Sequence, residues 1–308
     1  MEFFKKSIEN PWHFAIALWS RGLLNWLPDK AYLKLLYRGF FNKKLDLKNP
    51  RTFNEKLQWL KLYDRNPMYT KMVDKYEAKE YVSSKIGSEY VIPTLGVWDR
   101  FDDIDFDKLP DQFVLKCTHD SGGLVIVKDK SKFDKIAAKA KIEKCLKYDF
   151  YKYGREWPYK NVKHRIIAEK YMEDSGSLDL KDYKFFSFNG LCMAMFIATD
   201  RQNTDTETKF DFFDANGNHL DLVNIHPNAE YTPKLPENFE KMKELAAVLS
   251  KDIPQLRVDF YEVNGDIYFG ELTFAHGTGF EAFYPESWDY KFGEWIKLPE
   301  SARGGVYS

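Results

Sequence analysis

The spacing of apolar residues changes along the chain, from a helical period in the first hundred residues to strand-like runs after Phe113. In NPRTFNEKLQWLKLYDRNP, residues 49–67, Thr52 and Glu55 have the spacing of a capping box, in which each side chain satisfies a free backbone N–H at a helix start. In DKYEAKEYVSSKIG, residues 74–87, apolar residues recur three to four positions apart, and the closing glycine is placed to end a helix. The first part is therefore predicted to be mainly helical.

From Phe113 onward the pattern is typical of β-structure. Two apolar runs, FVLKC and LVIVK, flank a polar loop that ends in Ser-Gly-Gly. A lysine-rich helical segment at about 131–150 then precedes a strand, RIIAEKYM, at 165–172. Asn-Gly turns, which tolerate the positive φ angles of tight hairpins, occur in residues 183–197, 210–220 and 257–272, and a helix is predicted at 237–250. Successive hairpins imply a largely antiparallel sheet, so the predicted fold class is α+β.

Composition narrows the classes of protein. At 308 residues the chain is long enough for two lobes with a sizeable core, and 44% hydrophobic residues argue for a folded protein. A formal net charge of −1 provides no overall field to attract nucleic acid, so no nucleic-acid partner is expected. The cysteines Cys117, Cys145 and Cys192 contain no Cys-x-x-Cys pair, which argues against a zinc site. Their odd number suits a reducing compartment, so a cytoplasmic location is expected.

The first 30 residues are rich in aromatic and apolar side chains. Charged residues interrupt them, so they contain no 18-residue apolar run, and they lack the order of a signal peptide. Two interpretations stay open for an amphipathic aromatic helix here: it packs on the main domain, or it makes peripheral contact with the inner face of a membrane.

Two acidic residues of the last hairpin, Asp259 and Glu271, lie 12 positions apart. A two-residue Asn-Gly turn would set Asp259 opposite Gly270 and send Glu271 to the other face, whereas a three-residue Asn-Gly-Asp turn would set the two carboxylates opposite one another. Paired carboxylates repel unless a cation or proton lies between them, and Mg²⁺ with a nucleotide commonly takes one or two carboxylates. Taken alone, the residues favour the register in which one carboxylate faces solvent.

Two further features could take part in binding a ligand. Lys116, on the first apolar run, and the glycines that follow it could form a phosphate site, because glycine lets backbone N–H groups approach phosphate and lysine adds a charge. Glu169, which ends an apolar strand, could accept a hydrogen bond from an adenine amino group. Each alone has a simpler explanation, since strand lysines usually point outward and strand-end glutamates usually lie in water.

Taken together and in this order, the motifs resemble those of the ATP-grasp superfamily. More closely, the chain resembles the TupA-like ATP-grasp family, named for teichuronopeptide biosynthesis and often found with bacterial capsule or exopolysaccharide genes. The resemblance covers roughly residues 45–300 and rests on NPRTFNEKLQWLKLYDRNP, DKYEAKEYV, FVLKCTHDSGG, EWPYKNVKHRIIAEKYM, DYKFFSFNG and VDFYEVNGDIYFGELTF. It implies a helical N-terminal region at 1–90 and two α+β lobes that clasp ATP, at 91–172 and 173–308.

The resemblance also implies roles for residues of a nucleotide site. Lys75 and Lys116 match two phosphate-contacting lysines. The loop that closes over the phosphates comprises Ser121, Gly122 and Gly123. The hinge that reads adenine comprises Glu169, Lys170, Tyr171 and Met172, with Glu169 as the side-chain contact. Where the superfamily often contacts ribose, phosphate or acceptor, this chain has Asp182 and Lys184.

The implied cofactors are ATP and Mg²⁺. Asp259 and Glu271 match the magnesium ligands, which favours the three-residue turn. The superfamily commonly has Asn two positions after that glutamate, whereas this chain has Thr273, whose hydroxyl can still ligate or orient a metal-bound water. Arg257 matches an arginine that some ligases use on the transferred phosphate, and with Lys116 and Lys184 it completes the expected catalytic set. In the segment that follows, His276 is either an acid/base or acceptor contact, or an ordinary polar loop residue.

The implied activity is that of an ADP-forming ligase, which activates a carboxylate as an acyl phosphate for capture by an amine. The expected acceptor is a small molecule or a glycan, such as a sugar acid of a polysaccharide precursor. Three alternatives stay open: a glycosyltransferase, for which Asp103-Ile104-Asp105 offers the metal motif, a sugar kinase with the same ATP site, and a non-catalytic scaffold.

Two surface segments carry alternatives of their own. The lysines of 128–147 could attract an anionic glycan or lipid, or they form a solvated helix face. In FYKYGREWPY, residues 150–159, aromatic side chains could stack on sugars while Arg155 binds a carboxylate, or the segment is a packing corner between a helix and a strand.

Overall fold

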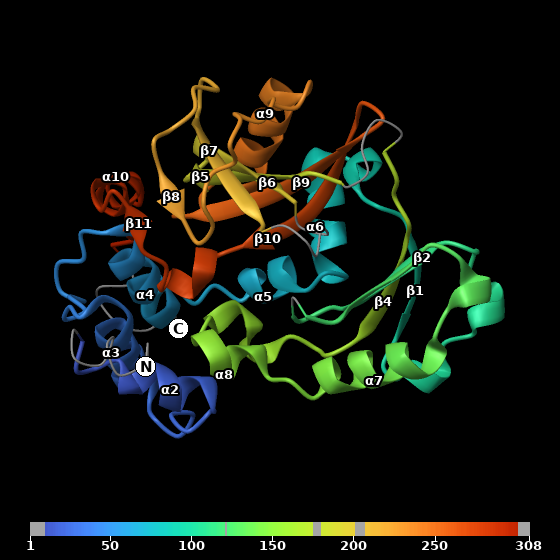
Figure 1. Ribbon diagram of the computed structural model, residues 1–308, viewed down its shortest axis with the longest axis horizontal. Helices are drawn as coiled ribbons and strands as arrows, with labels where there is room; N and C mark the ends of the chain where they lie inside the picture. The colour runs from blue at the N-terminus through green and yellow to red at the C-terminus, as the bar shows by residue number, and fades with distance from the viewer. Residues whose placement is uncertain (1–9, 121, 175–179, 201–206, 301–308) are drawn as a thin grey trace.

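The computed structural model describes residues 10–120, 122–174, 180–200 and 207–300 (Figure 1). Ser121, predicted to belong to a phosphate loop, lies outside the described residues, as do the first nine residues of the aromatic N-terminal segment.

The N-terminal part is helical, as predicted. Its helices are α2 (Phe14–Ser20), α3 (Asp29–Phe41), α4 (Phe53–Tyr63), α5 (Met68–Val73) and α6 (Glu77–Ile86). The predicted capping box is confirmed, because the Thr52 hydroxyl accepts from the Glu55 N–H and the Glu55 carboxylate accepts from the Thr52 N–H. Helix α6 ends at Gly87, whose φ of 118° is open mainly to glycine.

A four-stranded antiparallel sheet forms one end of the molecule (Figure 1). Its strands are β1 (Thr94–Trp98), β2 (Phe113–Cys117), β3 (Leu124–Val127) and β4 (Ile166–Lys170), in the order β1-β4-β2-β3. Helix α7 (Lys135–Leu146) covers its outer face through Ala138 and Ile142, and α8 (Phe150–Gly154) follows. The hairpin predicted around the Ser-Gly-Gly loop is therefore confirmed as β2 and β3.

A five-stranded antiparallel sheet forms the centre of the molecule, in the order β10-β9-β5-β6-β7. Its strands are β5 (Asp182–Phe188), β6 (Leu191–Thr199), β7 (Lys209–Asp214), β9 (Leu256–Val263) and β10 (Asp266–Thr273). The short strands β8 (Val223–Asn224) and β11 (Phe283–Tyr284) pair separately, and the helices are α9 (Phe239–Leu249) and α10 (Ser287–Trp295). Short 3-10 turns are η1 (Ser88–Tyr90), η2 (Phe101–Asp103), η3 (Phe106–Lys108), η4 (Lys130–Lys132), η5 (Trp157–Asn161) and η6 (His276–Gly279).

Two of the three predicted Asn-Gly hairpins form as expected, β5 with β6 and β9 with β10. The third is shorter than predicted, because after β7 the chain returns only as far as a single bridge between Phe213 and His219. Beyond that bridge the Leu220 N–H still donates to the Phe212 carbonyl at 2.8 Å, and the chain then leaves the sheet, with Leu222 buried in the core that contains Phe212.

Both faces of the large sheet are covered, so strand β5 is buried at every position. Phe185 faces the core formed with α5, α6 and α9, whereas its neighbour Phe186 faces α4 and α10 through Phe53 and Phe292. Because side chains alternate along a strand, every second residue of β5 and β9 shares the face of Phe186. That face carries the polar residues of the candidate site.

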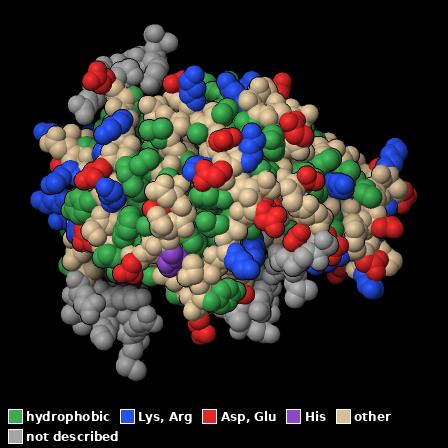
Figure 2. Space-filling view, turned by 90° about the horizontal axis from the view of Figure 1, so that it is seen from above, with side chains coloured by type: hydrophobic (Ala, Val, Ile, Leu, Met, Phe, Trp, Pro, Cys, Tyr) green, Lys and Arg blue, Asp and Glu red, His purple; other side chains and the backbone are tan. Residues whose placement is uncertain are grey.

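The predicted segments map onto these layers only in part. The small sheet falls within 91–172 and the large sheet within 173–308, but α5 and α6 pack into the core of the large sheet. The boundaries themselves stay a prediction. Acidic and basic side chains are interspersed over the face seen in Figure 2, in keeping with the net charge of −1. Within the described residues, no helix is both long and apolar enough to cross a membrane.

Replacing Thr52 with alanine should lower the free energy of unfolding by about 1 kcal/mol, because the Glu55 N–H loses its acceptor. Thr52→Ser keeps the oxygen and should recover most of this loss. Urea unfolding of the three proteins tests the expectation, and equal losses for both variants would contradict it.

Asp64, at the end of α4, predicts a pH dependence of stability. Burial raises its pKa to about 6, although the Tyr69 hydroxyl donates to it at 3.2 Å. The folded protein therefore binds this proton more tightly than the unfolded chain, and stability should fall as the pH rises from about 4 to 6, by up to roughly 3 kcal/mol. Asp64→Asn should remove this component, so the difference between the two unfolding free energies should change with pH; a constant difference would contradict the prediction.

Candidate active site

The β9–β10 hairpin brings Asp259 and Glu271 into direct register, but not by the predicted turn. Val263 pairs with Asp266 across a two-residue Asn-Gly turn whose residues both have positive φ, 52° and 86°. The three-residue turn was therefore wrong. A β-bulge at Gly270 adds one residue to β10 and restores the pairing, so that Glu271 lies opposite Asp259. Glycine suits the bulge, because a Cβ there would lie 3.1 Å from the Asp259 carbonyl oxygen, a close contact that the neighbouring strand would have to relieve.

Arg257 lies at the centre of the polar cluster on this face. Its guanidinium donates two hydrogen bonds to the Asp259 carboxylate, from Nε to Oδ1 at 2.8 Å and from Nη2 to Oδ2 at 2.7 Å. Nη2 also donates to Glu271 Oε1 at 3.1 Å and to Thr273 Oγ1 at 3.0 Å. The three residues predicted to ligate a metal are thus brought together, and all three contact the same guanidinium.

Lys184 completes the charge balance from the neighbouring strand. It lies opposite Asp259 in the pairing of β5 with β9, and its Nζ donates to Asp259 Oδ2. Burial alone would raise the pKa of Asp259, but Arg257 and Lys184 outweigh burial and hold that pKa well below its usual range. Asp182, two residues before Lys184 on the same face, is buried and lies 3.8 Å from the Lys184 ammonium.

The His276 side chain is hydrogen-bonded to Arg257 and is not an exposed loop residue. It is buried, with Nδ1 2.9 Å from Arg257 Nη1 and Nε2 2.8 Å from Asn224 Oδ1. A guanidinium can only donate, so Nδ1 accepts and Nε2 carries the hydrogen that is donated to Asn224. Burial, with the charge of Arg257, lowers the pKa of His276 well below its usual value, which keeps the ring neutral. The ordinary-loop interpretation was therefore wrong, and Asn224 had no sequence signal at all.

A cavity of ≈ 130 Å³ opens beside this cluster, between the two sheets. Its lining includes Lys75, Lys116 and Gly123, which were predicted to contact or cover phosphate. The large sheet contributes Asp182, Lys184, Tyr261, Gly270 and Glu271. Lys75 is held there by its backbone, which donates to the Thr118 carbonyl at 3.0 Å, while its Nζ donates to the Asp120 carbonyl. Positive side chains from both sheets thus face one space.

A second cavity, of ≈ 260 Å³, lies along the predicted hinge and shares Lys116 and Tyr261 with the first. Its lining includes the whole predicted hinge, Glu169, Lys170, Tyr171 and Met172, together with apolar side chains such as Ile92, Val114, Leu124 and Ile126. A largely apolar space that adjoins a lysine-lined one suits a ligand with an apolar part and an anionic tail.

Glu169 is more deeply engaged than predicted. Its two carboxylate oxygens pair with Lys79 at 2.5 Å and with Lys116 at 2.6 Å, and its side chain is buried. Burial would raise the pKa of Glu169, but the two ammonium groups outweigh burial and lower it. The side-chain contact with adenine stays a prediction. Lys79, which the sequence analysis did not identify, lies on α6, whereas Lys75 precedes that helix.

The two described glycines of the predicted phosphate loop differ in the space that each leaves for a side chain. A Cβ on Gly123 would lie 2.5 Å from Cys117 Sγ and 2.7 Å from Cys117 Cβ, so this glycine lets the loop close onto β2. Gly122 has no such neighbour, since the nearest atoms to a Cβ would be 3.7 Å away. The Asp120 carboxylate accepts from the Gly123 N–H at 3.1 Å and fixes the turn.

Gly123→Ala should therefore destabilise the protein by about 1–3 kcal/mol, whereas Gly122→Ala should change the free energy of unfolding by less than about 0.5 kcal/mol. Thermal and urea unfolding compare the two variants with the parent protein. Equal effects would show that the close approach to Cys117 does not constrain the loop.

Known proteins provide an independent comparison. The D-alanine–D-alanine ligase of Bacillus anthracis in complex with ATP is 16% identical, with a TM-score of 0.38, over 66% of this chain and 53% of that one. The Helicobacter pylori D-alanine–D-alanine ligase is 14% identical, with a TM-score of 0.43, over 82% and 69%. The ATP-grasp ligase PsnB in complex with minimal precursor, Mg and ADP is 9% identical, with a TM-score of 0.38, over 72% and 57%. The chain thus spans little more than half the length of the Bacillus anthracis ligase.

No curated protein matches the sequence. The profile of the TupA-like ATPgrasp family matches residues 55–297, which contain both sheets and every residue of the candidate site. The predicted α+β ATP-grasp fold is confirmed, and the chain belongs to the TupA-like ATP-grasp family.

Proposed function

We propose that this protein is an ATP-dependent ligase that joins a carboxylate to an amine through an acyl phosphate. The observation that carries the proposal is the convergence of Lys75, Lys116 and Lys184 on one cavity, with the Arg257 cluster beside it. Three ammonium groups and a guanidinium suit the charge of a transferring phosphoryl group, which catalysis of this kind must neutralise.

The nucleotide would lie across the two connected cavities. The base would occupy the apolar hinge cavity, against the backbone of 169–172, and the phosphates would extend to Lys75 and Lys116. The loop that ends at Gly123 would cover the phosphates, because it joins β2 to β3 next to the cavity that Lys75 and Lys116 line. Lys116 lines both cavities and is therefore placed at the junction of base and phosphates.

The residues at the cluster also fit Mg²⁺ by their chemistry. Asp259 and Glu271 are adjacent carboxylates and Thr273 adds a hydroxyl, the all-oxygen donor set that Mg²⁺ prefers when phosphate oxygens complete it. Among the described residues there is no group of three or more His, Cys, Asp or Glu that could hold a metal by itself. The ion would therefore depend on the nucleotide, and when bound it would neutralise phosphate charge.

The chain's own side chains account for the remaining steps. An acceptor carboxylate oxygen attacks the γ-phosphorus, the bond to the β-phosphate oxygen breaks, and ADP leaves. An amine then attacks the acyl carbon, phosphate leaves with the C–O bond electrons, and the nitrogen loses a proton. Lys184 and Arg257 would stabilise the charge on the phosphoryl group and on the tetrahedral intermediate. His276, neutral and bonded to both Arg257 and Asn224, would hold the guanidinium in place.

The family resemblance extends the proposal to the acceptor. We infer a sugar acid or glycan of capsule or exopolysaccharide biosynthesis, modified in the cytoplasm through a new C–N bond. Contact with the inner face of the membrane is supported by three exposed apolar side chains near the N-terminus, Phe14, Leu23 and Trp26, at 45%, 54% and 79% exposure.

The alternative functions have less support. In the Asp103-Ile104-Asp105 motif, Asp103 pairs with Arg100 and Asp105 with Lys108, and neither aspartate lines the cavities described above. A sugar kinase would share the ATP site and differ in its product.

Lys116→Ala should weaken Mg·ATP binding at least tenfold, because it removes a charged contact at the junction of the two cavities. Glu169 keeps Lys79 as a partner, so the variant should still fold. Lys132→Ala, an exposed lysine on the same lobe, is the matched control and should bind normally. Calorimetric titration gives the affinities. If the Lys116 variant bound Mg·ATP as tightly as the parent protein, the assignment of Lys116 to the ATP site would be wrong.

Product analysis tests the reaction itself. With pools of amino acids and uronic acids whose carboxylates carry ¹⁸O, turnover should release ADP and transfer one ¹⁸O atom to each phosphate, because the carboxylate oxygen leaves with phosphorus. A stable phosphoester without free phosphate would indicate a kinase, and a new glycoside without ATP consumption would indicate a glycosyltransferase.

A further inference from the structure

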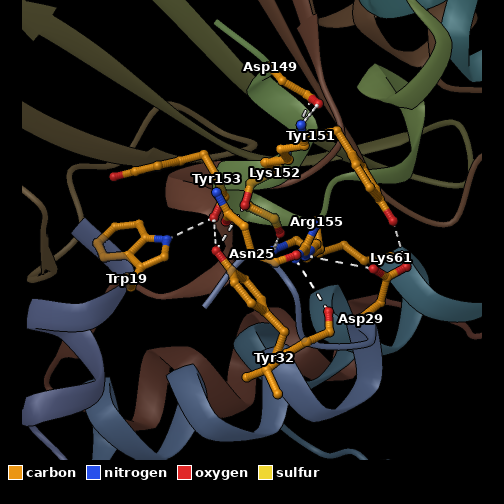
Figure 3. Close-up of polar contacts among 12 residues, drawn as sticks. Trp19, Asn25, Asp29, Tyr32, Lys61, Asp149, Tyr151, Lys152, Tyr153 and Arg155 are labelled. Carbon is orange, nitrogen blue, oxygen red and sulfur yellow. Dashed lines mark hydrogen bonds and ion pairs between the residues drawn. The ribbon is translucent and has the colours of Figure 1, made fainter. Parts of the chain in front are cut away.

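A third cavity, of ≈ 260 Å³, lies beside the N-terminal helices. It is a groove between the helical hairpin of α2 and α3 and the segment 147–153, and it shares no lining residue with the two nucleotide cavities. Figure 3 shows the side chains that join its walls. We name it the aromatic groove, and the lining residues used below are Trp19, Asn25, Lys147, Tyr148, Lys152 and Tyr153.

The walls of the aromatic groove are fixed by contacts between segments far apart in sequence (Figure 3). The Trp19 ring lies against the Tyr153 ring, with centroids 4.4 Å apart, and its Nε1 donates to the Tyr153 carbonyl at 2.8 Å. The Tyr32 hydroxyl donates to the carbonyls of Lys152 and Tyr153, at 3.0 and 2.8 Å. Arg155 donates to the Asn25 carbonyl at 2.8 Å. A groove held in this way loses little conformational entropy when a ligand binds.

Arg155 itself is not available to a ligand. It is buried, lies over the Tyr32 ring, and is 3.7 Å from the Asp29 carboxylate. The packing-corner interpretation of FYKYGREWPY is therefore correct for this arginine, whereas Tyr153 of the same segment faces the groove.

The exposed groups of the aromatic groove have the chemistry of a sugar site. Tyr148 is 44% exposed and offers a ring face on which a pyranose can stack, and Tyr153, whose ring packs against Trp19, is 37% exposed in the same groove. The Asn25 side-chain amide forms no hydrogen bond with any described residue, so it can both donate to and accept from hydroxyl groups. Lys147 is exposed and has no ion pair within the described ranges, unlike Lys152, which pairs with Asp149 at 3.2 Å. An unpaired ammonium beside aromatic rings favours a sugar that carries a carboxylate.

The aromatic groove is also joined to the segment after β10 that borders the Arg257 cluster. Lys61 donates to the carbonyl of Gly154, next to Tyr153, and to the carbonyl of Thr278. Thr278 and its neighbours Gly277 and Gly279 have positive φ, and Thr278 is strained there because it is β-branched. Gln58 donates to the Gly279 carbonyl at 2.7 Å, so α4 holds this segment and the groove wall together.

We propose that the aromatic groove binds an acidic pyranose residue of a glycan chain, at a distance from the carboxylate that reacts. The proposal rests on the ligase function proposed above and specifies its acceptor: a chain longer than one sugar, gripped outside the reaction site. An isolated uronic acid would reach the reaction site without using the groove.

The experiment measures binding of a trigalacturonate and of the neutral trisaccharide maltotriose by calorimetry, with Mg·ATP binding measured in parallel. Tyr148→Ala and Asn25→Ala should each weaken trigalacturonate binding about tenfold, through loss of stacking or of hydrogen bonds. Lys147→Ala should lower the affinity for trigalacturonate and leave that for maltotriose unchanged. Trp26→Ala, an exposed aromatic substitution on the same hairpin but outside the groove, should change neither.

The outcomes separate this proposal from the ligase proposal. The groove assignment would be overturned if all the groove variants still bound trigalacturonate, or if the parent protein did not bind it. In either case the ligase proposal would stand if ATP affinity and ADP release were normal. Groove-dependent glycan binding without Mg·ATP binding would instead contradict the ligase proposal and leave the glycan site in place. Equal losses in Trp26→Ala and Tyr148→Ala would also overturn the assignment, because the groove would not be distinguished from the rest of the hairpin.

Discussion

The buried charge cluster around Arg257 is the interaction on which the site depends. Two cations, Arg257 and Lys184, and the carboxylates of Asp259 and Glu271 meet on one face of the large sheet. Removing charges from water is costly, and that cost is offset only when each charge has partners at good distances. The cluster meets this condition through bidentate pairing of Arg257 with Asp259, and through His276, which takes up a further guanidinium N–H without adding charge. Strand alternation, the bulge at Gly270 and the buried Asn224 all serve this arrangement.

A second charge group connects the two sheets. Lys79 belongs to α6, whose Ala78 and Val82 pack in the core of the large sheet, whereas Glu169 and Lys116 lie on neighbouring strands of the small sheet. The ion pair of Glu169 with Lys79 therefore crosses from one structural layer to the other, whereas its pair with Lys116 lies within the small sheet. The pair with Lys116 also fixes that lysine where the cavity along 169–172 meets the cavity beside the Arg257 cluster.

Sequence patterns were sufficient for most of the helices and strands, because helix caps, Asn-Gly turns and alternation are local signals; the roles of the site residues stay predictions. The capping box at Thr52 and the β2–β3 hairpin are examples. The turn of the β9–β10 hairpin was wrong because a two-residue turn and a bulge together produce the pairing that a three-residue turn would produce, and only backbone geometry separates them. His276, Asn224 and Lys79 depend on contacts between residues distant in sequence or on burial, which one sequence does not encode locally.

The group formed by Lys79, Glu169 and Lys116 has a consequence for how the sequence can diverge. Losing either lysine weakens the pairing of a buried carboxylate, and losing Glu169 leaves two neighbouring ammonium groups to repel one another. An apolar replacement of all three could preserve folding, but it would remove the Lys116 ammonium from both of the cavities proposed to bind the nucleotide. A substitution of Lys79, which lines neither of these cavities, would leave Glu169 with Lys116 alone, so it is expected to lower stability, and less so where Glu169 has changed as well.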